Sequence, residues 1–183
     1  MTLFNKYLFD SRIEDSASIE LSFLFAYIWH KIKIFSRVGT MSDQYLSIKE
    51  ATQSIIDEFS LFEDWMERYE YIIELGQNLD NLPDEKKIDM YRVKGCQSQV
   101  WFVATENFNR IRFEADSDAM IVRGLISLLL RVYSNRTPDE IAETPPDFFE
   151  AVNLGSHLSG NRANGLAAMV AHIQSYGKIK TEI

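Results

Sequence analysis

The sequence has 183 residues, of which 46% are hydrophobic and 25% charged, and a formal net charge of -8. This size and composition are those of one globular domain, and the acidic balance argues against a partner with a phosphate backbone or an anionic membrane surface. The single cysteine, Cys96, excludes an internal disulfide, argues against a thiolate-rich zinc site and indicates a reducing, cytoplasmic location.

The first forty residues differ from the rest. Their most apolar stretch, Ile19 to Trp29, is too short for a membrane-spanning helix, which needs about 20 apolar residues. Acidic residues precede it and no small-residue cleavage site follows, so it does not resemble a secretory signal. Two interpretations stay open: residues 1–40 are an amphipathic extension that lies on another surface, or they precede a true start at Met41. We favour the second and expect one domain over residues 41–183.

Two helices are predicted at the start of this domain. Apolar residues recur every three or four positions from Ile48 to Phe62, which is the spacing of one helix face. Asp64 and Glu67 have the spacing of a capping box, and the apolar stripe of a second helix continues from Tyr69 to Leu79. Pro83 marks the break after it.

A small antiparallel sheet of about three strands is predicted next. Tyr91 to Lys94 would form a short strand, and Val100 to Thr105 is rich in β-forming residues. After a turn at residues 107–109, polar and apolar side chains alternate from Arg110 to Asp116, which is the clearest strand signal in the chain. Cys96 therefore lies between two predicted strands.

Three helices are predicted to follow the sheet. Capping groups at residues 116–118 precede the apolar segment Ile121 to Val132, which indicates a buried central helix. Thr137-Pro138-Asp139-Glu140 combines an N-cap, a proline in the first turn and a capping-box glutamate, so a short helix follows. The last helix is expected from about Asn161 to Tyr176, with Gly177 ending it. Strands and helices segregated in this way indicate an α+β fold with helices on one side of the sheet.

Cys96 is the side chain with the most reactive chemistry. Gly95 can adopt positive φ values, so a sharp turn can present Cys96 at the tip of a loop. The thiolate is a strong nucleophile, and a free cysteine is already a few per cent ionised at neutral pH. A buried structural cysteine explains the same pattern, and spacing alone favours that interpretation.

The segment VKGCQSQVW, from Val93 to Trp101, is one of several sequence blocks that occur in a distinctive order. The others are Tyr71–Gly76, Asp116–Ala119, Gly124–Ile126, His157–Leu158, Arg162 and Gly165–Leu166. Together these blocks resemble the SufE family, in which the first block is the sulfur-acceptor motif. The resemblance runs from Ile48 to about Tyr176 and leaves residues 1–40 outside.

The resemblance implies a SufE/IscU-like fold and the function of a sulfur carrier. A partner cysteine desulfurase of the SufS type makes a persulfide on its own cysteine, and the Cys96 thiolate attacks the outer sulfur. The desulfurase is thereby stimulated, and Cys96 passes the sulfur to an iron-sulfur scaffold such as the SufBCD complex. Pyridoxal phosphate belongs to the desulfurase, so this chain is expected to bind no cofactor and no metal. It is thus a partner with a catalytic cysteine rather than a stand-alone enzyme.

The resemblance also marks residues that would support the loop or bind the partner, each with a simpler explanation. Arg162 is expected to dock the desulfurase or stabilise the incoming sulfur anion, unless it is an ordinary surface arginine. His157 can tune Cys96 or make a structural hydrogen bond, and Asp118 can face the desulfurase or serve the next helix as an N-terminal charge. Gln97 and Ser98, beside Gly95, can bond to the loop backbone or contact the partner.

Other functions are left open. A partner of the CsdA-type desulfurase would carry the same motifs. An iron-sulfur scaffold of the IscU type would share the fold, although a cluster needs several thiolates and the chain has one cysteine. A cysteine hydrolase that pairs Cys96 with His157 would need an oxyanion donor and an orienting acid, and the sequence reveals neither. The oligomeric state, including a homodimer, stays open as well.

Overall fold

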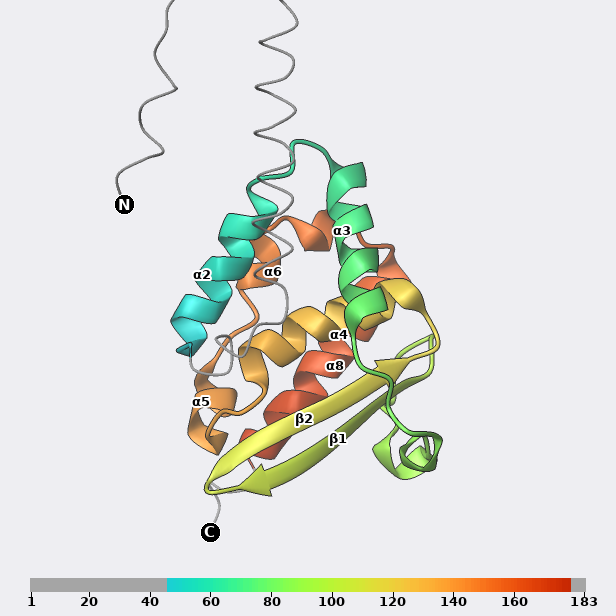
Figure 1. Ribbon diagram of the computed structural model, residues 1–183, viewed down its shortest axis with the longest axis vertical. Coiled ribbons are helices and arrows are strands. Elements are labelled where there is room, and N and C mark those ends of the chain that lie inside the picture. Colours follow the sequence, from blue (N-terminus) through green and yellow to red (C-terminus); the bar gives the residue numbers. More distant parts are fainter. Residues whose placement is uncertain (1–45, 179–183) are drawn as a thin grey trace, which may run out of the picture. The chain divides into compact units, whose positions relative to one another are not determined.

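The computed structural model describes residues 46–178, and the predicted division after residue 40 lies outside them. Two helices precede a β-hairpin and the other α-helices follow it, which confirms the α+β class (Figure 1). In chain order the elements are α2 (Ile48–Phe59), α3 (Trp65–Asn78), the 3-10 helices η2 (Asp84–Lys86) and η3 (Asp89–Tyr91), β1 (Val100–Asn107), β2 (Arg110–Ser117), α4 (Met120–Tyr133), α5 (Pro138–Glu143), α6 (Phe148–Ala151), α7 (Leu154–His157) and α8 (Gly160–Lys178).

Within residues 46–178 the sheet has two strands, so the prediction of about three strands is wrong. β1 and β2 pair antiparallel along their whole length. The segment expected to form the extra strand makes an isolated bridge between Arg92 and Trp101 and a hydrogen bond from the Val93 N–H to the Val100 carbonyl at 2.9 Å. Tyr91 ends η3 and Gly95 turns the chain, so too few residues remain for a strand.

One face of the hairpin packs on helices, as the sequence predicted. Phe102 of β1 and Phe113 of β2 make an edge-on ring contact, with centroids 6.3 Å apart. From α8, His172 contacts the Phe102 ring and Tyr176 contacts the Phe113 ring. These aromatic contacts hold α8 against one face of the hairpin, and Figure 1 shows α8 behind the two strands.

The opposite face of the hairpin is covered by the segment that leads into it. Trp101 and Val103 are buried there against Leu82, and the half-buried Tyr91 packs on the same cluster. Alternate residues of β1 thus face two separate apolar layers, which explains why the start of this strand is buried on both sides.

Helix α4 is the buried centre of the helical layer. Its side chains Leu125, Ile126, Leu128 and Leu129 are at most 1% exposed. Helix α3 contacts α4 closely because two glycines lie at the crossing. A Cβ added to Gly124 would overlap the backbone of Ile72, and one added to Gly76 would overlap the backbone of α4. The start of α4 is therefore held firmly beside α3.

The helix ends follow the predicted caps only in part. The Asp64 carboxylate accepts from the Glu67 N–H at 2.9 Å, and Thr137 and Glu140 form the predicted capping box. Gly177, however, does not end α8. The helix continues through it to Lys178, and a Cβ at Gly177 would lie 2.7 Å from the backbone nitrogen of Ala142 in α5. This glycine serves a close helix contact rather than a turn.

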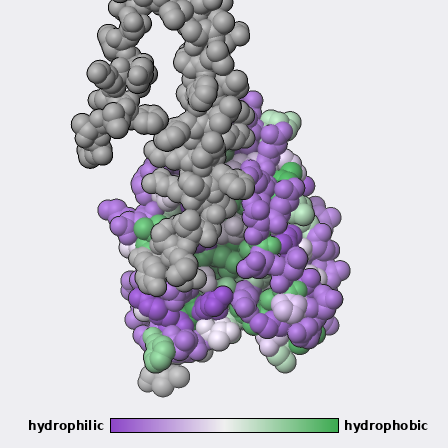
Figure 2. Space-filling model, viewed as in Figure 1, coloured by the Kyte–Doolittle hydropathy of each residue, from purple (hydrophilic) through white to green (hydrophobic). Residues whose placement is uncertain are grey.

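The described surface is mainly polar around an apolar interior. Figure 2 shows a mainly hydrophilic face, with a smaller number of hydrophobic residues exposed near its centre and at its edges. None of the helices over residues 46–178 is both long and apolar enough to cross a membrane.

Candidate functional site

The loop of residues 94–99 carries Cys96 and rests on helix α8. Gly95 has a φ of 94°, a value that residues with a Cβ rarely adopt, so the predicted sharp turn is present. A Cβ added at Gly95 would lie 3.4 Å from the Cβ of Ala168 in α8. The turn therefore brings the loop tip into contact with the helix.

Backbone hydrogen bonds close the base of this loop. The Gln99 N–H donates to Oδ1 of Asp118 at 2.9 Å, and the Asp118 N–H donates to the Gln99 carbonyl at 3.3 Å. Helix α4 begins at Met120, with Ala119 as its N-cap residue and no side-chain cap. Asp118 therefore makes no capping hydrogen bond to α4, and its carboxylate instead holds the end of the cysteine loop.

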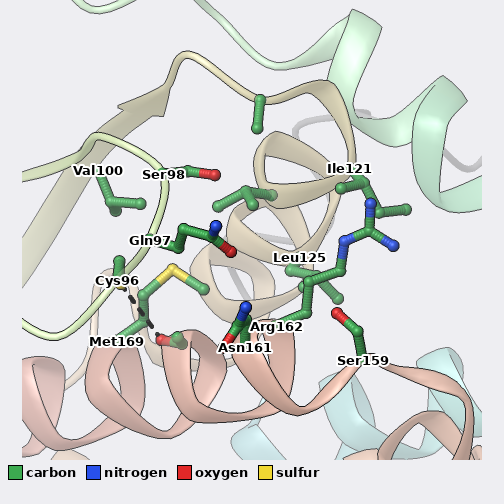
Figure 3. Close-up of a pocket in the computed structure, with 13 residues that line it drawn as sticks. Cys96, Gln97, Ser98, Val100, Ile121, Leu125, Ser159, Asn161, Arg162 and Met169 are labelled. Carbon is green, nitrogen blue, oxygen red and sulfur yellow. Dashed lines mark hydrogen bonds between the residues drawn. The ribbon is translucent and has the colours of Figure 1, made fainter.

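The Cys96 side chain turns toward α8 rather than outward (Figure 3). It is half-buried, and its S–H donates to the carbonyl of Gly165 at 3.4 Å. Burial disfavours the charged thiolate and so raises the pKa of Cys96. At rest the thiol is therefore kept protonated and partly shielded from solvent.

A cavity of about 420 Å³ lies beside Cys96. Its apolar wall comes from the start of β1, the start of α4 and the middle of α8, namely Val100, Ala119, Ile121, Val122, Leu125 and Met169. Polar residues from the cysteine loop and the start of α8 complete the lining, as Figure 3 shows: Gln97, Ser98, Ser159, Asn161 and Arg162. The cavity thus joins an apolar floor, which would hold a neutral or polarisable group, to a polar edge.

Arg162 is the cationic residue of this lining. Its guanidinium carbon lies 5.9 Å from the centre of the Tyr69 ring, so the aromatic face of α3 supports the charge. Within residues 46–178 no carboxylate pairs with Arg162, whereas Arg123 and Arg131 both have acidic partners. The structure therefore places a cation at the cavity without an internal counterion from this part of the chain.

His157 lies apart from the cavity. Its ring stacks on the indole of Trp65, with centroids 4.2 Å apart and the planes 13° from parallel. It is not among the lining residues, and it is exposed at the end of α7. The hydrolase interpretation needs His157 as a base for Cys96, and this placement does not support it.

Several residues of the site had no functional role predicted from the sequence, among them Asn161, Gly165 and Met169 of α8. A signal for two of them was present, because Arg162, Gly165 and Met169 follow one another at intervals of three and four. That spacing places them on one face of a helix.

No group of three potential metal-ligating side chains occurs in the described part of the chain.

Comparison with known proteins agrees with the sequence motif. The SufE family model, described as an Fe-S metabolism associated domain, matches residues 53–177. An uncharacterized SufE-like protein of Rhizobium meliloti is 40% identical over 126 residues, which cover 66% of this chain and 90% of that protein. Another from Rhizobium etli is 41% identical over 131 residues, covering 69% of this chain and 88% of its own.

The fold also has a counterpart among solved structures. The solution structure of a hypothetical protein from Thermus thermophilus aligns with a TM-score of 0.60 at 18% identity. The match covers 73% of this chain and 97% of the other. At this level of identity the likeness concerns the fold.

Proposed function

The chain belongs to the SufE family, whose domain is associated with Fe-S metabolism, and from this premise we propose that Cys96 accepts a sulfur atom from a cysteine desulfurase and carries it to an iron-sulfur scaffold. The observation that supports the proposal most is the position of the thiol. Cys96 lies on a loop turned by Gly95, with its sulfur beside a cavity that has an apolar floor and a cationic edge. A polarisable, anionic sulfur species suits such a lining.

The transfer needs only thiol exchange chemistry. The Cys96 thiolate attacks the outer sulfur of a persulfide on the donor's cysteine, a new S–S bond forms at Cys96, and the donor's S–S bond breaks. The electron pair of the broken bond leaves with the donor's thiolate, so no external oxidant or reductant is consumed. Delivery to the scaffold repeats the exchange in the opposite sense and returns Cys96 to its thiol.

Each feature of the site has a part in this cycle. Because burial keeps the resting thiol protonated, an isolated carrier is protected from stray oxidation. The partner must therefore help to ionise Cys96, by bringing a base or a positive charge, or by drawing loop 94–99 away from α8. Arg162 would stabilise the anionic sulfur as it enters, since a fixed cation favours a nearby thiolate or persulfide anion.

The partners follow from the same proposal. The donor is a SufS-type desulfurase, or one of the CsdA type, and the receiver is a scaffold of the SufBCD type, with all three in the cytoplasm. Pyridoxal phosphate would belong to the donor, where it supplies the chemistry that releases sulfur from cysteine. The chain's own contribution is the nucleophile and the site around it.

Desulfurase turnover tests the proposal. A SufS-type enzyme given cysteine and a reductant is expected to release alanine faster when the wild-type chain is added, because each transfer frees the enzyme's own cysteine. Cys96→Ser keeps a similar size without the thiol and is expected to give no stimulation. Equal stimulation by Cys96→Ser would contradict the proposal, since binding alone would then explain the effect.

A further inference from the structure

Gly165 is a glycine inside a helix for which the resting structure shows no packing reason. Glycine is less favourable than alanine in a helix interior. At Gly76, Gly124 and Gly177 an added Cβ would overlap the backbone of a neighbouring helix, so packing explains those residues. At Gly165 the nearest atoms to an added Cβ are Sγ, Cα and Cβ of Cys96, at 3.7, 3.9 and 4.0 Å. These are ordinary contact distances, and alanine would fit there.

We propose that Gly165 is a specificity-determining residue that leaves room for the second sulfur atom of a Cys96 persulfide. The inference rests on the proposed function. It explains the missing side chain at Gly165 by the needs of the Cys96 persulfide, because the Cys96 thiol would leave room for alanine. A second sulfur would lie about 2.05 Å from Sγ, the length of an S–S bond. A Cβ only 3.7 Å from Sγ would exclude that sulfur from the directions that point toward residue 165.

The carbonyl of Gly165 excludes a further position for the second sulfur atom. In the thiol form, the S–H points to this oxygen with Sγ 3.4 Å away. A sulfur atom in place of that hydrogen would press against the oxygen, so the persulfide must rotate about its Cβ–Sγ bond. Cys96 and Gly165 both line the 420 Å³ cavity, so the rotated persulfide would lie in the cavity beside Gly165. Glycine at 165 thus accommodates the rotated persulfide, and alanine would accommodate the thiol better than the persulfide.

The test uses a small donor, so that partner docking does not enter. Glutathione persulfide exchanges with Cys96 to give the Cys96 persulfide and glutathione, with one S–S bond formed and one broken. Wild type and Gly165→Ala are equilibrated with a fixed ratio of glutathione persulfide to glutathione, and intact-mass spectrometry gives the loaded fraction. Gly160→Ala is the matched control, because an added Cβ at the first residue of α8 meets no atom within 4 Å.

The expected result is an exchange equilibrium constant lowered about tenfold in Gly165→Ala, the usual scale for forcing an extra atom into a filled site. Gly160→Ala should match wild type. Thermal unfolding of the unloaded Gly165→Ala protein should occur at or above the wild-type temperature, since alanine favours the helix. A purely structural role for Gly165 would instead lower the unfolding temperature and leave the exchange constant unchanged.

Two results would overturn the inference. One is equal loading of wild type and Gly165→Ala by glutathione persulfide. The other is a lower loaded fraction in Gly165→Ala that occurs only with the desulfurase as donor. The space at Gly165 would then be needed for docking of the desulfurase and not for the persulfide. Failure of the proposed function would give a different pattern of results. Wild type would load from glutathione persulfide and Gly165→Ala would load less, but the desulfurase would transfer no sulfur to either protein.

Discussion

Asp118 accepts a hydrogen bond from the backbone N–H of Gln99 at 2.9 Å and returns one to the Gln99 carbonyl from its own N–H. The two residues lie at the end of the cysteine loop and just before helix α4. The reciprocal pair therefore fixes the end of the loop at the junction between β2 and α4, while the tip of the loop rests on α8. The position of Cys96 depends on both attachments.

Removing the Asp118 carboxylate should loosen the cysteine loop. In Asp118→Ala the Gln99 N–H loses its acceptor, and the loss of one such hydrogen bond, about 1 kcal/mol, should raise the alkylation rate of Cys96 roughly fivefold. Asp118→Asn keeps an oxygen acceptor and is the matched control. The rates are measured with iodoacetamide at fixed pH. Equal rates in wild type and Asp118→Ala would show that this bond does not restrain the loop.

The alkylation rate of Cys96 should rise with pH, with a midpoint above that of an ordinary cysteine. Because burial raises the pKa of Cys96, the alkylation rate should reach half of its plateau at a higher pH in the folded protein than in a free cysteine. The comparison is the same protein unfolded in urea. A midpoint at or below that of the unfolded chain would contradict the shielded resting thiol.

The same shift has a consequence for stability. The folded state holds the Cys96 proton more tightly than the unfolded state, so this contribution is complete below the unfolded pKa and is lost as the pH rises through the folded pKa. Urea unfolding across that alkaline range should therefore show a decline in wild type that is smaller in Cys96→Ser.

Asp116 should contribute more to stability than any exposed ion pair. Its side chain is 2% exposed and binds Arg123 and Lys87, and it accepts from the N–H groups of Leu82 and Ser117. In Asp116→Ala the buried Arg123 loses its carboxylate partner and keeps only backbone carbonyls as acceptors, and the free energy of unfolding should fall by about 3 kcal/mol. Glu114→Ala removes a half-exposed ion pair on the same strand and should cost about 0.5 kcal/mol. Equal losses in the two variants, measured by urea unfolding, would contradict this ranking.

Acid should weaken the same network. Burial acts to raise the pKa of Asp116, but hydrogen bonds from Lys87 and from the Ser117 and Leu82 backbone, with the charge of Arg123, outweigh it and lower that pKa. The stability from Asp116 is therefore present above the ordinary pKa of aspartate and is lost as the pH falls through the lower folded value. Asp116→Ala should lack this part of the acid dependence.

Arg162 should affect transfer more than folding. Its guanidinium lies at the cavity edge over the Tyr69 ring. With this chain as the varied sulfur acceptor, Arg162→Ala should lower kcat/KM for alanine release by the desulfurase about fivefold or more. That is the effect of losing a contact worth about 1 kcal/mol. Arg162→Lys keeps the charge and should recover part of the activity. An unchanged kcat/KM in Arg162→Ala would make this residue an ordinary surface arginine.

The fold class could be predicted because its elements have strong local patterns. The alternation after Arg110 indicated β2, and the apolar run from Ile121 to Val132 indicated α4. The third strand could not be excluded in the same way, because Arg92 and Val93 do bond to β1 but over too short a length to form a strand. The short helices α6 and α7 lack the length that makes helical periodicity visible.

The sequence pointed to Cys96 and to Gln97, Ser98 and Arg162, which line the same cavity, but it did not reveal the contacts that hold the cysteine loop. A carboxylate before an apolar helix has the same pattern whether it caps that helix or, like Asp118, binds a loop that is distant in sequence. The glycines raise the same difficulty, since Gly177 permits a helix contact where a helix end was expected. The direction of the Cys96 side chain depends on tertiary packing, so the sequence could not show that the thiol faces a cavity.

Mass spectrometry of the intact chain after incubation with a SufS-type desulfurase and cysteine tests the central claim most directly. We predict that wild type gains the mass of one sulfur atom at Cys96, that reductant removes it, and that Cys96→Ser gains nothing. No added sulfur on wild type beside an active desulfurase, or the same gain on Cys96→Ser, would contradict the claim that Cys96 carries the sulfur.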